Sequence, residues 1–179
     1  MKKFIRFLQN ILLVIELTFY VAYLHIDKVL FVSIIALDQY VKSQVLSNMT
    51  LGETIPLVQN VFHITFVANP GAAFGILPYQ RAFLLAVGVL MLAAGIFYYT
   101  KIKVENPLVK FAGIIAAAGA LGNMIDRVTI GFVIDWFEVR GFPVFNVADV
   151  AIVIGMFMMM YVVIFQSEKS NGVKEVRQP

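Results

Sequence analysis

The sequence predicts an all-α membrane protein, with four transmembrane helices and a small extracytoplasmic β-sheet element. Of the 179 residues, 60% are hydrophobic and only 14% are charged. A soluble domain of this size has about half apolar and about a quarter charged residues. Several apolar segments approach the length of about 20 residues that spans a bilayer. One polar connection between them shows the alternation of a β-strand.

The predicted spans are four apolar segments separated by polar or basic residues. They cover residues 29–46, 82–99, 111–125 and 150–166. The third is rich in alanine and glycine, a composition that favours close packing between membrane helices. We therefore expect one membrane domain over residues 29–166, followed by a polar cytoplasmic tail at residues 167–179.

The N-terminal extension, residues 1–28, is harder to assign. Three basic residues precede the apolar run 11–24, an arrangement that imitates a secretory signal peptide. The small-x-small cleavage pattern is missing near Leu24, so we do not expect cleavage. Residues 25–28 then interrupt the apolar run. The extension is either an interfacial helix or an inward continuation of the first span.

Positive charge orients the predicted bundle. Basic residues mark the connection between the second and third spans and the C-terminus as cytoplasmic: Lys101, Lys103, Lys110, Lys169, Lys174 and Arg177. Both termini are then cytoplasmic, and the connections at residues 47–80 and 126–145 are external.

The β-element is expected within residues 47–80. Residues 61–68 alternate with a period of two, which is typical of a half-buried strand. Pro56 and the turn sequence Asn69-Pro70-Gly71 are expected to bound it.

Composition also excludes several classes of function. The chain has no cysteine, so disulfides, a cysteine nucleophile and thiolate metal sites are excluded. His25 and His63 lie far apart in the sequence, which disfavours a histidine metal centre. The net charge of +3 is mild, and the basic residues cluster at the ends and in one loop. This pattern fits membrane orientation better than nucleic-acid binding.

Uncommon polar residues gather at the predicted outer ends of the spans. They are Asp38, Lys42, Asn69, Asn123, Asp126, Arg127, Asp135, Asn146 and Asp149. Each ionisable group near hydrocarbon costs about 2.5–3.5 kcal/mol on insertion scales, and such groups usually serve a function. Taken singly, Asp135 is also consistent with a solvated loop acid and Asp149 with an ordinary acid at a helix N-terminus. Asn69 fits plain turn chemistry.

Five short motifs resemble one family when they are taken together and in order. They are DQYVK at 38–42, NPGAAF at 69–74, GALGNMIDR at 119–127, VIDW at 133–136 and FNVAD at 145–149. In this order and between the predicted spans, they resemble the signatures of lipoprotein signal peptidase (signal peptidase II), a family of bacterial membrane aspartic peptidases.

The resemblance implies a function and a site. The family removes signal peptides from bacterial prolipoproteins at the inner membrane, cutting before a cysteine that carries diacylglycerol. Its catalytic aspartates map onto Asp135 and Asp149, with the active site near the outer face. The external sheet would cradle the substrate, and the substrate's acyl chains would lie against helix faces among membrane lipids. No metal or organic cofactor is implied.

Physical chemistry supports a paired-carboxylate site. Two neighbouring carboxylates do not both ionise easily, so one keeps a proton while the other accepts a proton from water. Asp149 is expected at a helix N-terminus, which favours an anion, and Asp135 is expected on a loop. A substrate-binding or supporting shell is expected from the remaining polar motif residues: Asn69, Gly71, Asn123, Asp126, Arg127 and Asn146.

Two further expectations concern pairing. Asp38 and Lys42 are four residues apart, so on a helix they share a face and can form an ion pair with a structural or orienting role. Arg127 is expected to pair with a carboxylate or a lipid headgroup.

Three rival functions remain to be weighed. A transporter would use membrane carboxylates as an ion relay, but it predicts polar residues at several depths. A structural subunit has no need of two acids around an asparagine-rich turn. Other intramembrane aspartyl peptidases carry a Gly-x-Gly-Asp signature, which is absent from this chain.

Overall fold

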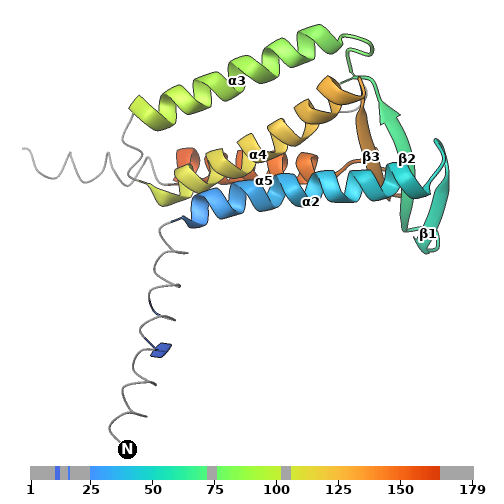
Figure 1. The fold of residues 1–179 in the computed structure, drawn as a ribbon, viewed down its shortest axis with the longest axis horizontal. Coiled ribbons are helices and arrows are strands. Elements are labelled where there is room, and N and C mark those ends of the chain that lie inside the picture. Colours follow the sequence, from blue (N-terminus) through green and yellow to red (C-terminus); the bar gives the residue numbers. More distant parts are fainter. Residues whose placement is uncertain (1–10, 13–15, 17–24, 72–75, 102–105, 166–179) are drawn as a thin grey trace, which may run out of the picture.

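The computed structural model describes residues 11–12, 16, 25–71, 76–101 and 106–165. Four long helices and one small sheet make up this part of the chain (Figure 1). The tail at 167–179 and most of the N-terminal extension at 1–28 lie outside the described residues, as do residues 72–74 of the second motif.

Three helices of the described chain are long and apolar enough to cross a membrane: α2 (Ile26–Asn48), α4 (Pro107–Thr129) and α5 (Val147–Phe165). The helix α3 (Arg81–Lys101) has a shorter apolar stretch, Arg81–Phe97, among the residues searched. Each predicted span therefore coincides with a helix. One detail differs: the sequence predicts that the first span begins at Val29, whereas α2 already begins at Ile26 and includes most of the polar interruption at 25–28.

The helices α4 and α5 run in opposite directions and pack closely through glycine. A Cβ atom added at Gly155 of α5 would lie 2.6 Å from the carbonyl oxygen of Ala112. At the other end of the pair, a Cβ atom at Gly119 would collide with the carbonyl oxygen of Ala148. Small residues let the two backbones approach, as the alanine- and glycine-rich composition predicted.

The helices α2 and α4 run parallel. Near their starts, Lys110 and Asp27 form an ion pair of 2.9 Å. Further along both helices, Lys42 and Asp126 form a second ion pair, also of 2.9 Å. The helix α3 packs on α4 near Gly88, where an added Cβ would lie 2.8 Å from the Met124 sulfur. Figure 1 shows α3 to one side of the group that α2, α4 and α5 form.

The sheet has three antiparallel strands in the order β1-β2-β3. Their bounds are Thr54–Val58, Phe62–Asn69 and Val133–Val139. The sheet lies at the end of the helices where α2 and α4 end and α5 begins (Figure 1). Phe66 of β2 and Ile134 of β3 are buried with Val45 of α2, so a hydrophobic cluster joins the sheet to the helices.

The predicted strand at 61–68 is confirmed by β2, but the rest of the β-element differs from expectation. Pro56, expected in the boundary before this strand, lies within the neighbouring strand β1, paired opposite His63. Proline is tolerated there because β1 is an edge strand, where a missing N–H leaves no ladder bond unmade. The sheet also extends beyond residues 47–80, since β3 comes from the connection after α4. Asp135 therefore lies on a strand and not on a loop.

Candidate active site

Asp135 lies in the middle of β3 with its side chain only 2% exposed. Two amide side chains donate to its carboxylate: Asn69 Nδ2 to Oδ2 at 2.9 Å and Asn146 Nδ2 to Oδ1 at 2.7 Å. Burial, and next the negative charge of Asp149, raise the pKa of Asp135 to about 7. This carboxyl group can therefore hold or release a proton near neutral pH.

Asp149 lies in the first turn of α5 and is half-buried. Its Oδ1 accepts a hydrogen bond of 2.7 Å from Asn123 Nδ2. Its Oδ2 accepts one from the backbone N–H of Asn146 at 3.2 Å, while Asn146 Oδ1 accepts the backbone N–H of Asp149 at 2.9 Å. This reciprocal arrangement is a capping box at the start of α5, and it holds the Asp149 carboxylate at the helix N-terminus, as expected.

Asn146 connects the two acids. Its side chain, 1% exposed, donates to Asp135, and its backbone and side chain bind Asp149 through the capping box. The same amide nitrogen also contacts the oxygens of Asn123 and Ile134 at 3.1 and 3.3 Å. The structure thus brings together Asp135 from the sheet and Asp149 from a helix around one asparagine, as a paired-carboxylate site requires.

A pocket of about 230 Å³ opens beside Asp135. It is lined by Val67, Ala68, Asn69, Pro70, Asp135, Pro143 and Val144. The lining is mostly apolar, with Asp135 and Asn69 as its polar groups. Such a pocket can admit a short stretch of extended chain next to a carboxyl group. In the described part of the chain, no three His, Cys, Asp or Glu side chains are grouped so that they could hold a metal ion.

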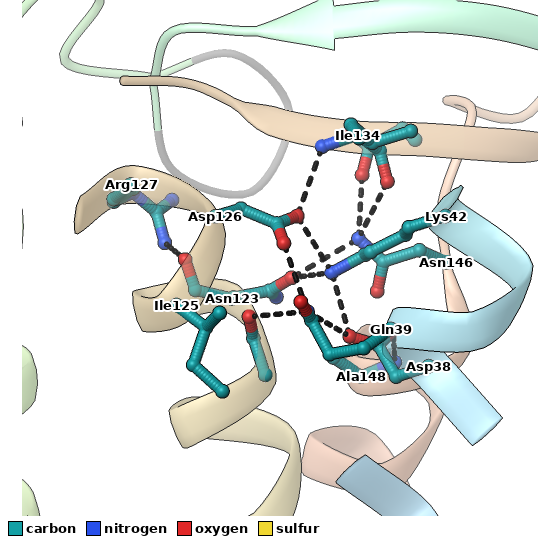
Figure 2. A network of polar contacts seen from close by, with 12 residues as sticks. Asp38, Gln39, Lys42, Asn123, Ile125, Asp126, Arg127, Ile134, Asn146 and Ala148 are labelled. Atoms are coloured by element: carbon teal, nitrogen blue, oxygen red, sulfur yellow. Dashed lines mark hydrogen bonds and ion pairs between the residues drawn. The ribbon is translucent and has the colours of Figure 1, made fainter. Parts of the chain in front are cut away.

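Lys42 lies at the centre of a buried ionic network (Figure 2). Its ammonium nitrogen lies 2.8 Å from Asp38 Oδ2 and 2.9 Å from Asp126 Oδ2. The four-residue spacing predicted the first of these ion pairs correctly. The third contact of Lys42, a hydrogen bond of 2.9 Å to Asn123 Oδ1, joins the network to the candidate site.

The two carboxylates of this network also hold backbone groups. Asp38 Oδ1 accepts the N–H of Ala148 in the first turn of α5 at 2.9 Å. Asp126 Oδ2 accepts the N–H of Ile134 on β3 at 3.2 Å. Asp38 thereby helps to position the helix that carries Asp149, and Asp126 helps to position the strand that carries Asp135.

Gln39 is a member of this network that the sequence analysis did not single out. Its amide nitrogen contacts Asp126 Oδ1 at 2.9 Å, the carbonyl oxygen of Gly122 at 3.1 Å and Asp38 Oδ2 at 3.2 Å. It lies next to Asp38 within the first motif, which was the available signal. Its acceptors Gly122 and Asp126 lie on α4, so no spacing within the first motif indicates them.

Arg127 has partners other than those expected. It donates to the carbonyl oxygens of Gly71 at 2.7 Å and Asn123 at 3.2 Å. These partners of Arg127 are backbone carbonyls and not a carboxylate, because the end of α4 lies next to the turn after β2. A lipid-headgroup partner stays a prediction. Asn69 closes that turn by accepting the N–H of Gly71 at 2.9 Å. Asn69 therefore both closes the turn after β2 and donates a hydrogen bond to Asp135.

Helices able to span a membrane, together with two neighbouring aspartates held by amide side chains, are the features of a membrane aspartic peptidase. Comparison with known proteins makes the assignment specific. A family model described as signal peptidase (SPase) II matches residues 30–165. The chain belongs to this family.

Relatives named lipoprotein signal peptidase support the same assignment. The chain is 39% identical to one from Pelotomaculum thermopropionicum over 138 residues, 77% of this chain and 91% of the relative. It is 43% identical to one from Clostridioides difficile over 138 residues, 75% and 93% of the two chains.

A solved structure of a bacterial membrane enzyme is similar with a TM-score of 0.74 and 30% identity. The similarity covers 81% of this chain and 90% of that chain. The arrangement of helices and sheet is therefore that of a known membrane enzyme.

Proposed function

We propose that this chain removes signal peptides from diacylglyceryl-modified bacterial prolipoproteins, cutting before the lipidated cysteine, with Asp135 and Asp149 as its catalytic pair. The observation that carries the proposal is the bridge through Asn146, which holds both acids at one place in a chain of the signal peptidase II family. Relatives with the name lipoprotein signal peptidase support the choice of substrate class.

The pair acts by general acid–base catalysis on an activated water molecule. One carboxylate accepts a proton from the water, which attacks the scissile carbonyl carbon. The protonated partner donates a hydrogen bond to the carbonyl oxygen and then helps to protonate the leaving amine. A raised pKa at Asp135 suits this chemistry, because one of the two acids must keep a proton near neutral pH. The two acids titrate as a unit, so the shared proton belongs to the pair.

The supporting shell keeps the pair in place and leaves a space for the substrate. Asn69, Asn123 and Asn146 donate amide hydrogens to the carboxylates. The pocket beside Asp135 is the proposed site for the substrate backbone next to the scissile bond. The helix of the signal peptide and the acyl chains would lie in the surrounding membrane lipids.

We further propose four transmembrane spans, formed by α2, α3, α4 and α5, over the membrane domain at residues 29–166. The basic residues Lys101, Lys103 and Lys110 favour a cytoplasmic connection between α3 and α4. Both termini are then cytoplasmic, and the sheet and the catalytic pair lie near the outer face of the bacterial inner membrane. The extension at 1–28 is proposed to be either an interfacial helix or an inward continuation of the first span.

The test is cleavage of a diacylglyceryl-modified prolipoprotein by the purified full chain in detergent. Asp135→Asn and Asp149→Asn are compared with the wild type after their folding has been checked by thermal unfolding. Each variant is expected to lose about 10²–10⁴-fold or more in kcat, because it lacks one member of an acid–base pair. Normal cleavage by both variants would exclude this site and leave Asp126 and Asp38 as the next candidates.

A further inference from the structure

The Lys42 side chain is buried deeply for a lysine, with 2% of its surface exposed. Two ion pairs with Asp38 and Asp126 are sufficient to compensate its charge. Its third contact is different in kind, since the ammonium group also donates to Asn123 Oδ1 at 2.9 Å. That hydrogen bond points away from the ion pairs and towards the candidate catalytic pair.

The contact with Lys42 determines which way the Asn123 amide faces. An ammonium group has only donors, so it must face the amide oxygen. The amide nitrogen of Asn123 is then turned to Asp149 Oδ1, to which it donates at 2.7 Å. In the reversed orientation, the amide oxygen would face the carboxylate and the amide nitrogen would face the ammonium group, and both contacts would be repulsive.

Asn146 reinforces the same orientation. Its amide nitrogen also faces Asn123 Oδ1, at 3.1 Å, while it donates to Asp135 at 2.7 Å. The oxygen of Asn123 thus receives two donors, one from α2 and one from the start of α5. Lys42 is thus connected to Asp149 through one side chain, Asn123, and to Asp135 through two, Asn123 and Asn146.

The charged groups around Lys42 come from every element packed against it. They are Asp38 on α2, Asp126 on α4, Asp135 on β3 and Asp149 on α5. The two carboxylates that bind Lys42 directly also hold Ala148 and Ile134 by their backbone N–H groups. Lys42 is therefore fixed by the same elements that carry the two acids.

We propose that Lys42 is a positioning residue for the catalytic pair, which orients the Asn123 amide so that its nitrogen donates to Asp149. The inference rests on the proposed function, because it assigns Lys42 a task at the site of that reaction. This role of Lys42 differs from that of a purely structural ion pair in one respect. Lys42 then acts on turnover through Asn123, and not only on the stability of the fold.

A double-mutant cycle between Lys42 and Asn123 tests this in the full chain. Lys42→Met, Asn123→Ala and the double variant are each assayed for kcat and KM with the diacylglyceryl-modified prolipoprotein. Each single variant is expected to lose about 10- to 100-fold in kcat, with KM within about twofold, because misplacement of a catalytic group acts on the transition state. The double variant should be within about twofold of Asn123→Ala alone, because the proposed effect of Lys42 on turnover passes through the Asn123 amide.

Removal of Lys42 alone leaves Asp38 and Asp126 facing each other without a cation, which can prevent folding. The same cycle is therefore also run with Asp126→Asn as its common background, which removes one of the two negative charges. The matched control is Lys110→Met, which breaks the Asp27 ion pair of similar length at the other end of the same two helices. This control should leave kcat within about twofold of the wild type.

The outcomes separate the two proposals. Coupled losses in kcat support the positioning role. The positioning role would be overturned if the losses in kcat of the two single variants multiplied in the double variant. It would also be overturned if a folded Lys42→Met variant kept the kcat of its background and showed only a lower Tm. In that case, inactive Asp135→Asn and Asp149→Asn variants leave the proposed function standing. If those two aspartate variants remain active, the proposed function fails, and the positioning role fails with it.

Discussion

At the scale of single residues, the two acids of the site have contrasting surroundings. Asp135 lies on a strand beneath the sheet surface and receives donors from side chains alone. Asp149 lies at a helix N-terminus and receives one backbone and one side-chain donor. Backbone donors at a helix start favour an anion, whereas deep burial favours a neutral acid. Burial, and next the negative charge of Asp149, raise the pKa of Asp135 to about 7, so the pair can keep a proton near neutral pH.

The first prediction concerns the pH dependence of activity. The pKa of Asp135 is raised to about 7 by burial and then by the charge of Asp149, so the pair loses its last proton above that pH. We expect kcat/KM for prolipoprotein cleavage to fall about tenfold per pH unit on the alkaline side of about pH 7. A profile that stays flat to about pH 9 would contradict a protonated acid in the active form.

Thermal unfolding checks the same group without substrate. The folded chain holds the Asp135 proton more tightly than the unfolded chain, where the ordinary pKa is 3.8. The associated stability is fully present below pH 3.8 and is lost as the pH rises towards about 7. The Asp135→Asn variant has no such ionisation. Its Tm relative to the wild type should therefore increase from about pH 5 to about pH 8.

At the scale of elements, the site depends on how closely α4 and α5 approach. Ala148 directly precedes Asp149 in the chain, and its carbonyl oxygen lies against Gly119. Gly122, one turn further along α4, makes room for Asp38, whose Oδ2 would lie 2.7 Å from an added Cβ. The glycines of the third motif thus allow three helices to converge directly below the two acids.

The second prediction is that Gly119→Ala separates α4 from α5. The added methyl group would collide with the Ala148 carbonyl oxygen and would lie 3.1 Å from the Cβ atom of Ala151. The start of α5 must therefore shift. We expect a loss of about 1–3 kcal/mol in the free energy of unfolding, together with reduced kcat. Thermal unfolding in detergent and the cleavage assay measure these two effects.

A matched control for this substitution is available on α3. An added Cβ at Gly95 meets nothing within 4 Å, so Gly95→Ala should change stability by no more than about 1 kcal/mol, in the stabilising direction. Equal destabilisation by both substitutions would show that the α4–α5 contact is not the cause.

At the scale of the whole molecule, the sheet and the helices form one site from distant parts of the chain. The strands β1 and β2 come from the connection after α2, whereas β3 comes from the connection after α4. Their pairing brings Asn69 next to Asp135. With α2 and α4 parallel and α5 opposed to them, both connections lie at the same end of the helices (Figure 1).

The third prediction concerns the proposed orientation in the membrane. The chain has no cysteine, so single cysteines can be introduced without removing any. In intact spheroplasts, a membrane-impermeant maleimide should label Gln59→Cys in the exposed β1–β2 turn. It should label Lys103→Cys only after permeabilisation, because the positive-inside rule places that connection in the cytoplasm. The reverse pattern would invert the topology and place the sheet inside.

Much of this architecture is predictable from the sequence because its signals are local. The lack of water in a bilayer requires long apolar segments, and the positions of α2, α3, α4 and α5 follow from these segments. The period-two alternation predicts β2, and the four-residue spacing predicts the pairing of Asp38 with Lys42. The order of the five motifs predicts the family, which the family model confirms.

Other features depend on contacts between residues far apart in the sequence. The sequence alone predicts a loop at Val133–Val139, because this segment gains its ladder partners from β2, which lies far away in the chain. Gln39 and Arg127 find their acceptors on other elements, at distances along the chain that no periodicity encodes. The sequence by itself determines which segments are apolar enough to span a membrane and which acids are candidates. Only tertiary packing, which must satisfy every buried charge and amide at once, determines that Asn146 and Asn123 join those acids to Lys42.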